Sequence, residues 1–489
     1  MPTAVSLDQR YIEFRDKTSA AFARFPQIEP LRYAIFRDLV IQPRAVGFPE
    51  TVKHWLRPWL NPGRTSQNLE RTDILVWVEG GRSIIGDTLL PVVRELRRRG
   101  AHVRLVSYSG PAGLPDRTVC FEHPHYARAP VWAWPAWEAL CAAEPHINRS
   151  FKRTFHYACA GLYSLLIEMD RVLAAMRPKV VVAASSQMIG GHGLFVSARQ
   201  RGIQTVLLQH GVVQPFYTPL PADVMLTWGR SSCDTLERLG MEPQRLLPLG
   251  SPRHDSMGSS VNGAARHSLM QKLGLDDRFM LLFFSNGNDL LRNGIAPMEC
   301  ARWLNAVAER FPDRLHVIVR LHPNEDGSLY RRYPRLLMTD SSLGFDQLME
   351  ACDCVSSLCS TAMYEALLYG KPVWQLYADG WPELADNWTG GFARRIASER
   401  ELIALMTRML NTRRGEGEMN GLVQDVFTNH GCAAAAVAEY ILSQAHSIDP
   451  HSQEGHADER GRQFPASPNT QVGHHKGSAG VALAPLKAP

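Results

Sequence analysis

The sequence predicts an α/β protein built from two doubly wound, Rossmann-like domains that face one cleft. Short continuous apolar runs, such as Ile-Leu-Val-Trp-Val at 74–78, are typical of parallel strands buried on both faces. Amphipathic helical segments alternate with these runs and often end at a glycine, as at Gly100. This alternation occurs twice along the chain, before and after a Gly/Ser/Asn-rich stretch at 257–265 that reads as a linker.

The chain divides into four predicted regions. Residues 1–70 form a helical appendage, with apolar positions such as Phe22 near helical spacing, and we assign it no function. An N-terminal Rossmann-like (acceptor) domain spans 71–255, and a C-terminal Rossmann-like (donor) domain spans 266–445. The tail at 446–489 is polar and Gly/Pro/His-rich without periodicity, which predicts disorder.

The first domain opens with a predicted βαβ unit, in which a helix near 87–99 connects two buried strands. Residues 110–150 are rich in Pro, Trp and His and are predicted to be an irregular loop insertion. The Gly-Gly-His-Gly sequence at 190–193 is predicted as a turn that precedes a helix at 194–201. The predicted strands of this domain lie at 74–78, 101–107, 179–184, 205–208, 224–227 and 246–249.

The stretch Cys354–Trp374 organises the second domain. It is predicted as a buried strand, a Ser/Thr-rich turn, a helix that ends at Gly370, and a second strand. Ser360 or Thr361 can cap the helix, and a capped helix start with free N–H groups and hydroxyls suits a phosphate. Further strands are predicted at 280–284 and 316–320, and the last helix at 433–443.

Composition excludes several classes of function. The formal net charge is +5 and no block of five or six like charges occurs, so we expect no nucleic-acid partner. The cluster Cys352, Cys354 and Cys359 lacks CxxC spacing and a neighbouring His, so we predict buried thiols and no metal site. No signal peptide and no run long enough to span a bilayer is present, which predicts a cytoplasmic protein with at most peripheral contact with the inner membrane.

Polar side chains follow the predicted strands of the second domain at their carboxyl ends, where ligands of such sheets bind. They are hydroxyls and cations, which suit a diphosphate, and no DxD motif is present to hold a metal with it. Glu365, one turn into the capped helix, can accept hydrogen bonds from ribose hydroxyls. The predicted donor-binding residues are Arg253, Ser285, Arg320, His322, Ser357, Ser360, Thr361 and Glu365.

Candidate bases follow the strands of the first domain. His210 comes directly after an apolar strand and before Gly211, and a neutral histidine can take a proton from a hydroxyl at neutral pH. Glu79 occupies the matching place after the first strand. The alternatives are structural: His210 can bond loop backbone, and Glu79 can cap a loop or a helix. We predict His210 and then Glu79 as catalytic residues.

Two groups of residues resemble a known family. Arg320-Leu-His322-Pro323, followed by Ser356-Ser357-Leu-Cys-Ser360-Thr361-Ala-Met-Tyr-Glu365, resembles bacterial capsule and surface-polysaccharide biosynthesis proteins with a GT-B glycosyltransferase fold, such as the Kdo-transferase-like and polysialyltransferase-like enzymes. Leu-Leu-Gln209-His210-Gly211 is similar to the same group. The resemblance covers roughly 73–445 and implies that the His-Pro and Ser/Thr segments bind the donor nucleotide. No clear Asp/Glu-rich polysialyltransferase motif is found, which argues against a sialic acid donor.

The preferred hypothesis from these residues is an inverting, metal-independent glycosyltransferase. It would move a sugar from a nucleotide-sugar co-substrate to a glycan or lipid-linked acceptor of the cell surface, with no other cofactor. One alternative is a non-hydrolysing UDP-GlcNAc 2-epimerase, which uses the same two-domain cleft, needs carboxylates beside the sugar ring and requires no acceptor. The other is a non-catalytic scaffold of polysaccharide biosynthesis or export.

Overall fold

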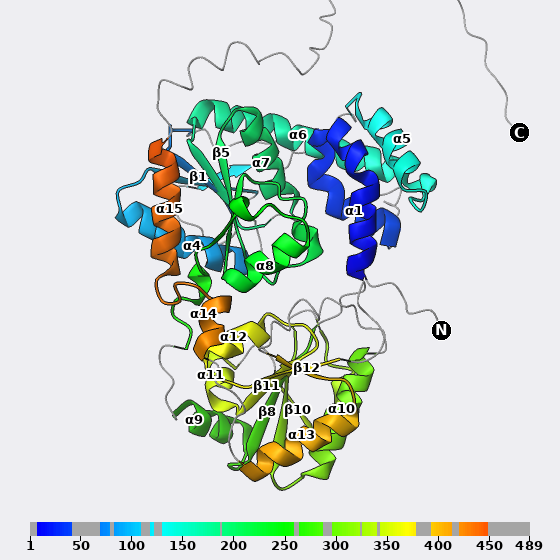
Figure 1. Ribbon diagram of the computed structural model, residues 1–489, viewed down its shortest axis with the longest axis vertical. Coiled ribbons are helices and arrows are strands. Elements are labelled where there is room, and N and C mark those ends of the chain that lie inside the picture. The colour runs from blue at the N-terminus through cyan, green and yellow to red at the C-terminus, as the bar shows by residue number, and fades with distance from the viewer. Residues whose placement is uncertain are drawn as a thin grey trace, which may run out of the picture. The chain divides into compact units, whose positions relative to one another are not determined.

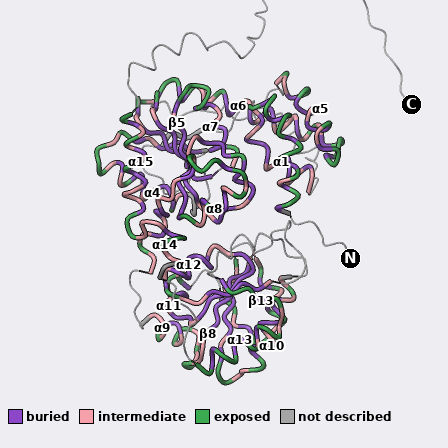
Figure 2. The backbone as a smooth tube through the Cα atoms, viewed as in Figure 1, coloured by how far each residue is buried: buried purple, intermediate pink, exposed green. Residues whose placement is uncertain are grey.

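The computed structural model describes residues 7–41, 69–78, 83–108, 118–121, 130–185, 188–258, 264–286, 296–322, 325–339, 343–377, 393–412 and 420–447. Two separate parallel β-sheets, each flanked by helices, form the bulk of this part of the chain (Figure 1). The central strands of both sheets are buried along most of their lengths, whereas the outer faces of many helices are exposed (Figure 2). The predicted class, an α/β protein with two doubly wound sheets, is confirmed.

The N-terminal sheet has seven strands in the order β3-β2-β1-β4-β5-β6-β7, and all neighbouring pairs are parallel. The direction of winding reverses between β1 and β4. Continuous apolar runs form these strands because helices cover both faces of the sheet. The strands are β1 Ile74–Trp77, β2 Val103–Tyr108, β3 Thr118–Phe121, β4 Val180–Ala183, β5 Gln204–Leu208, β6 Val224–Thr227 and β7 Leu246–Pro248.

Helices pack on both faces of this sheet, and each face has its own apolar cluster. Leu165, Met169 and Phe195 belong to the cluster on one face, contributed by α6 and α7. On the other face, α4 packs against α15, which returns from the end of the second half of the chain. The helices are α4 Ser83–Arg98, α6 Lys152–Met176, α7 Ile189–Gln200, α8 Arg230–Arg238 and α15 Ala433–Ser447, with short 3-10 turns η4 Pro215–Tyr217, η5 Pro243–Arg245 and η6 Pro252–His254.

A helical module packs beside this sheet and has its own aromatic core. Tyr11, Phe14 and Phe36 pack there against one another, and Phe216 of η4 inserts among them. The predicted appendage at 1–70 is therefore helical over 7–41, whereas 1–6 and 42–68 lie outside the described ranges. The module consists of α1 Leu7–Arg24, η1 Pro26–Leu31, α2 Arg32–Ile35, the π-helical η2 Phe36–Ile41, α5 Ala133–Ala143 and η3 Arg149–Phe151.

The C-terminal sheet has six parallel strands in the order β10-β9-β8-β11-β12-β13, so winding reverses between β8 and β11. Gly370 follows α12 with a φ of 65°, a left-handed conformation that favours glycine at a helix end. The strands are β8 Phe279–Phe284, β9 Leu315–Arg320, β10 Leu336–Thr339, β11 Cys354–Ser357, β12 Val373–Leu376 and β13 Ala393–Ile396. The helices are α9 Ala264–Leu273, α10 Ala296–Arg310, η7 Tyr330–Arg332, α11 Phe345–Ala351, α12 Ala362–Leu368, α13 Glu399–Thr412 and α14 Asn420–Val426.

Two local predictions were wrong. The predicted loop insertion at 110–150 contains strand β3 and helix α5, whose Trp137 and Leu140 enter the aromatic core of the module. The predicted turn at 190–193 lies inside α7. Glycine is needed there for space, because a Cβ at Gly190 would lie 2.2 Å from the Trp77 ring.

Candidate functional site

The reversal of winding marks a crevice in each sheet where side chains beyond the strand ends can meet a ligand. In the C-terminal sheet, the segments after β8 and β11 lie side by side. Asn286 joins them, since its amide donates to the main-chain oxygen of Cys359 at 2.7 Å and its carbonyl accepts from the Cys359 N–H at 3.3 Å. The predicted strand-end segments of this half are therefore brought together.

Ser285 links the end of β8 to the His-Pro segment. Its hydroxyl donates to Glu325 and accepts from the His322 main-chain N–H at 2.8 Å. The Ser285 N–H donates to the main-chain oxygen of Arg320 at 3.0 Å. The His322 side chain is exposed and the Arg320 side chain is half-buried. Sequence reasoning missed Glu325, which only the fold brings to Ser285.

The three hydroxyl residues of the Ser/Thr segment are not equivalent. Ser357 is fully buried, and its hydroxyl donates to the Phe284 main-chain oxygen at 2.7 Å, which ties β11 to β8. Ser360 is half-buried and accepts the Ala362 N–H at 3.3 Å. Thr361 is also half-buried and makes no side-chain cap to α12. Ser360 and Thr361 are thus the hydroxyls placed at the surface of this segment.

Glu365 lies in a buried charged cluster with two residues of η6. Its Oε1 atom accepts from Arg253 Nη2 at 2.7 Å and faces His254 Nε2 at 3.0 Å. Burial acts to raise the pKa of Glu365, but the hydrogen bond from His254 and the charge of Arg253 outweigh it and hold that pKa below its usual value. Burial also lowers the pKa of His254, so its imidazole is neutral and donates from Nε2.

This cluster connects the two halves of the chain. Arg253 and His254 follow the last strand of the N-terminal sheet, whereas Glu365 lies on α12 of the C-terminal half. The sequence named Arg253 and Glu365 separately as nucleotide ligands, and the structure pairs them with each other. His254 was missed, although it adjoins Arg253.

Gln209 and His210 lie at the end of β5 in the N-terminal sheet. Gln209 is buried and anchors the next strand, since its Oε1 accepts the Trp228 N–H at 2.8 Å and its main-chain oxygen accepts Trp228 Nε1–H at 2.9 Å. His210 is half-buried, and its Nδ1 lies 3.2 Å from the Tyr217 hydroxyl. The other predicted catalytic residue, Glu79, lies outside the described residues.

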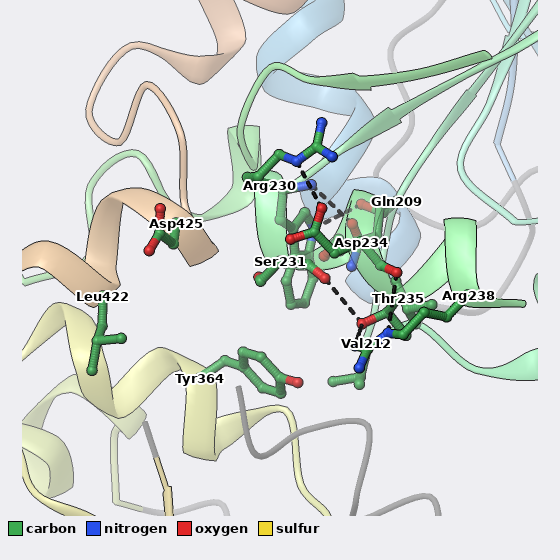
Figure 3. A pocket seen from close by; sticks show the side chains of 13 residues that line it. Gln209, Val212, Arg230, Ser231, Asp234, Thr235, Arg238, Tyr364, Leu422 and Asp425 are labelled. Carbon is green, nitrogen blue, oxygen red and sulfur yellow. Dashed lines mark hydrogen bonds and ion pairs between the residues drawn. The ribbon is translucent and has the colours of Figure 1, made fainter. Parts of the chain in front are cut away.

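A pocket of about 240 Å³ lies beyond the ends of β5 and β6 (Figure 3). One wall is α8, where Arg230 pairs with Asp234 at 2.7 Å, and the opposite wall includes Tyr364 of α12. The other described lining residues are Gln209, Val212, Val213, Trp228, Ser231, Ser232, Thr235, Arg238, Leu422 and Asp425. The pocket is smaller than the roughly 300–1,000 Å³ of typical ligand sites.

Within the described ranges, no group of three His, Cys, Asp or Glu side chains could hold a metal ion. Among the helices described, none is long and apolar enough to cross a membrane. Cys352 and Cys354 are buried, and burial raises the pKa of the Cys352 thiol to about 12.

Comparison with solved structures identifies the architecture. A protein from Listeria monocytogenes described as a UDP-N-acetylglucosamine 2-epimerase matches 78% of this chain and 98% of its own, with 14% identity and a TM-score of 0.54. The chain has the GT-B fold. The UDP-GlcNAc 2-epimerase of Neisseria meningitidis bound to UDP-GlcNAc matches 76% of this chain and 100% of its own, with 13% identity and a TM-score of 0.50. That of Methanocaldococcus jannaschii, in complex with UDP-GlcNAc and UDP, matches 76% and 99%, with 14% identity and a TM-score of 0.50.

These matches correct the functional prediction. The chain was predicted to be a glycosyltransferase of the capsule Kdo-transferase or polysialyltransferase kind, whereas the similar solved structures named above are described as UDP-GlcNAc 2-epimerases. No protein-family model and no curated protein matches the sequence. The transferase prediction was wrong because the GT-B fold and its nucleotide-binding segments serve both reactions, so those segments do not separate them.

Proposed function

We propose that this protein is an enzyme that binds UDP-GlcNAc and interconverts it with UDP-ManNAc by inverting C2 of the sugar, without hydrolysis. The observation that carries the proposal is the GT-B match over about three quarters of the chain and nearly the full length of 2-epimerases that bind UDP or UDP-GlcNAc. The joined segments after β8 and β11 are the proposed nucleotide site in the C-terminal half.

Inversion at C2 of the sugar requires a base for the C2 proton and a way for UDP to leave and return. No carbonyl adjoins C2, so its proton is not acidic, and inversion can instead proceed by elimination. A base takes the C2 proton, the C–H electron pair forms a C1–C2 double bond, and the C1–O bond breaks as UDP leaves. Return of a proton to the opposite face of C2 and re-addition of UDP at C1 complete the inversion. No acceptor and no redox cofactor enters this balance.

The predicted residues divide between these tasks. The residues proposed to hold the nucleotide and its diphosphate lie at or just after the ends of β8, β9 and β11; they are Ser285, Arg320, His322, Ser360 and Thr361. Cations and hydroxyls beside a departing diphosphate stabilise the charge that develops on it.

The catalytic pair is proposed from the N-terminal half. Glu79, which follows β1 in sequence, is the proposed C2 base, since a carboxylate is required beside the sugar ring. His210 is proposed to face the departing diphosphate as a hydrogen-bond donor. From the sequence, His210 was predicted as the base that deprotonates an acceptor hydroxyl. That role no longer applies, because an epimerase has no acceptor.

The test is to incubate the protein with UDP-GlcNAc in D2O and follow the sugar by proton NMR. Turnover should yield UDP-ManNAc and replace the C2 proton with deuterium, with no acceptor added. The Glu79→Gln variant should lose both signals while it retains UDP binding. A folded protein that binds UDP-GlcNAc but gives neither product nor exchange would contradict the proposal and favour a non-catalytic role.

A further inference from the structure

The segment between His210 and Thr218 is held from two sides. The 3-10 turn η4 places Phe216 and Tyr217 next to each other in sequence, and both side chains are buried. Phe216 packs into the aromatic core of the N-terminal helical module, whereas the Tyr217 hydroxyl lies 3.2 Å from His210 Nδ1. The turn therefore connects the module to the proposed catalytic histidine.

The module contacts this turn through aromatic side chains and hydrogen bonds. The Phe216 ring lies edge-on to Tyr11 and to Tyr33, with centroids 4.8 and 4.7 Å apart. The Tyr11 hydroxyl donates to the main-chain oxygen of Thr218 at 2.8 Å, and Arg15 Nη1 donates to the Thr218 hydroxyl at 2.7 Å. The two hydrogen bonds link residues more than 200 positions apart in sequence.

The surroundings of the Tyr217 hydroxyl determine which atom donates to the other. A buried phenol needs an acceptor for its proton. The main-chain N–H groups of His210 and Gly211 favour the ionised phenol, as donors toward its oxygen do, but burial outweighs them and raises the pKa of Tyr217. The phenol thus keeps its proton, and the acceptor that the described residues offer it is His210 Nδ1.

We infer that Tyr217 is a positioning residue that fixes the neutral tautomer of His210 with the proton on Nε2, and that the N-terminal module holds Tyr217 in place for this task. The inference rests on the proposed function for the part that His210 plays in turnover. A histidine fixed in this tautomer offers an N–H donor at Nε2 to a departing diphosphate oxygen and cannot act there as a base.

The tautomer can be measured in the full chain without substrate. A two-bond proton–nitrogen NMR spectrum of protein labelled with 15N-histidine, with His210→Gln to assign the His210 signal, should show Nδ1 unprotonated. A neutral hydrogen bond shifts an equilibrium constant about 2- to 10-fold. Tyr217→Phe should therefore raise the ratio of the Nδ1–H tautomer to the Nε2–H tautomer of His210 by that factor. Tyr330→Phe is the matched control, since Tyr330 is as buried as Tyr217, at 1% exposure, but lies in the C-terminal half.

Two further measurements separate the parts of the inference. Phe216→Leu should also increase the Nδ1–H tautomer of His210, as Tyr217→Phe does. If Phe216→Leu leaves the His210 signals unchanged, the module does not help to hold Tyr217 in place. Tyr217→Phe should lower kcat for UDP-GlcNAc about 2- to 10-fold with KM nearly unchanged.

Absence of turnover in the wild-type protein would refute the proposed reaction alone, because the spectrum is recorded without substrate. A wild-type His210 protonated on Nδ1, or a Tyr217→Phe spectrum identical to wild type, would overturn the assignment of Tyr217.

Discussion

The charged cluster around Glu365 should stabilise the folded chain even without a ligand, and Glu365→Gln tests this. The carboxylate is 3% exposed and accepts hydrogen bonds from Arg253 and His254. Glutamine keeps the shape and one acceptor oxygen but removes the charge that balances Arg253. Hydrogen bonds to charged groups contribute about 1.5–3 kcal/mol each. Breaking a fully buried pair costs about 3–5 kcal/mol, and Arg253 keeps 17% exposure, so we expect a loss of about 2–3 kcal/mol.

Urea unfolding followed by tryptophan fluorescence is a suitable assay. Trp228, one of the eleven tryptophans that contribute to this signal, packs edge-on against His254, with ring centroids 5.1 Å apart. The control is Glu168→Gln, which breaks an exposed pair with Arg171 and should change stability by less than about 1 kcal/mol. The double variant Arg253→Met with Glu365→Gln should lose less than the sum of the two single variants, because neither charge is then left unpaired.

An unchanged urea midpoint in Glu365→Gln would refute this reasoning. It would mean that the carboxylate gains nothing from its partners in the unliganded protein, and that its presence on α12 reflects ligand binding alone. Strict additivity in the double variant would likewise show that Arg253 and Glu365 do not interact energetically.

Four other outcomes are expected. Stability should fall as the pH drops below about 6.5, because the unfolded chain then binds a proton at His254 that the folded chain does not. The loss should steepen near and below pH 4.5, where the unfolded chain also binds a proton at Glu365 before the folded chain does. A melting temperature that is flat from pH 7 to 5 would contradict the part played by His254. Gly190→Ala should destabilise by about 1–3 kcal/mol in urea, since its methyl group would overlap Trp77, and a neutral result would mean that the ring moves aside freely. Asp255→Ala should cost about 1–2 kcal/mol, because its carboxylate accepts two N–H bonds at 2.8 Å at the start of α15; unchanged thermal melting would argue against this cap. His322→Ala should raise KM for UDP-GlcNAc severalfold with little loss of melting temperature, since the side chain is exposed, and unchanged kinetics would remove it from the nucleotide site.

The alternation of short apolar runs with amphipathic segments determined the class of fold. The runs at 74–78 and 179–184 are hydrophobic throughout because parallel strands are buried on both faces, and this pattern is local enough to read from the chain. The carboxyl ends of strands could be located in the same way, so Ser285, His210 and the Ser/Thr segment were found. The helical turn at 190–193 was misread because Gly190 is required by the bulk of the Trp77 ring beside it, and the sequence does not show that the two residues are neighbours.

The sequence by itself thus determined two doubly wound halves and the strand-end residues that a nucleotide-sugar could meet. Only the tertiary structure decided the partners of those residues. Arg253 and Glu365 lie 112 positions apart, and Tyr11 reaches Thr218 across 207 positions, so no periodicity or motif predicts either contact. Such contacts depend on how separate elements pack, and they pair Glu365 with residues of the other half and place the N-terminal helices against the turn beside His210.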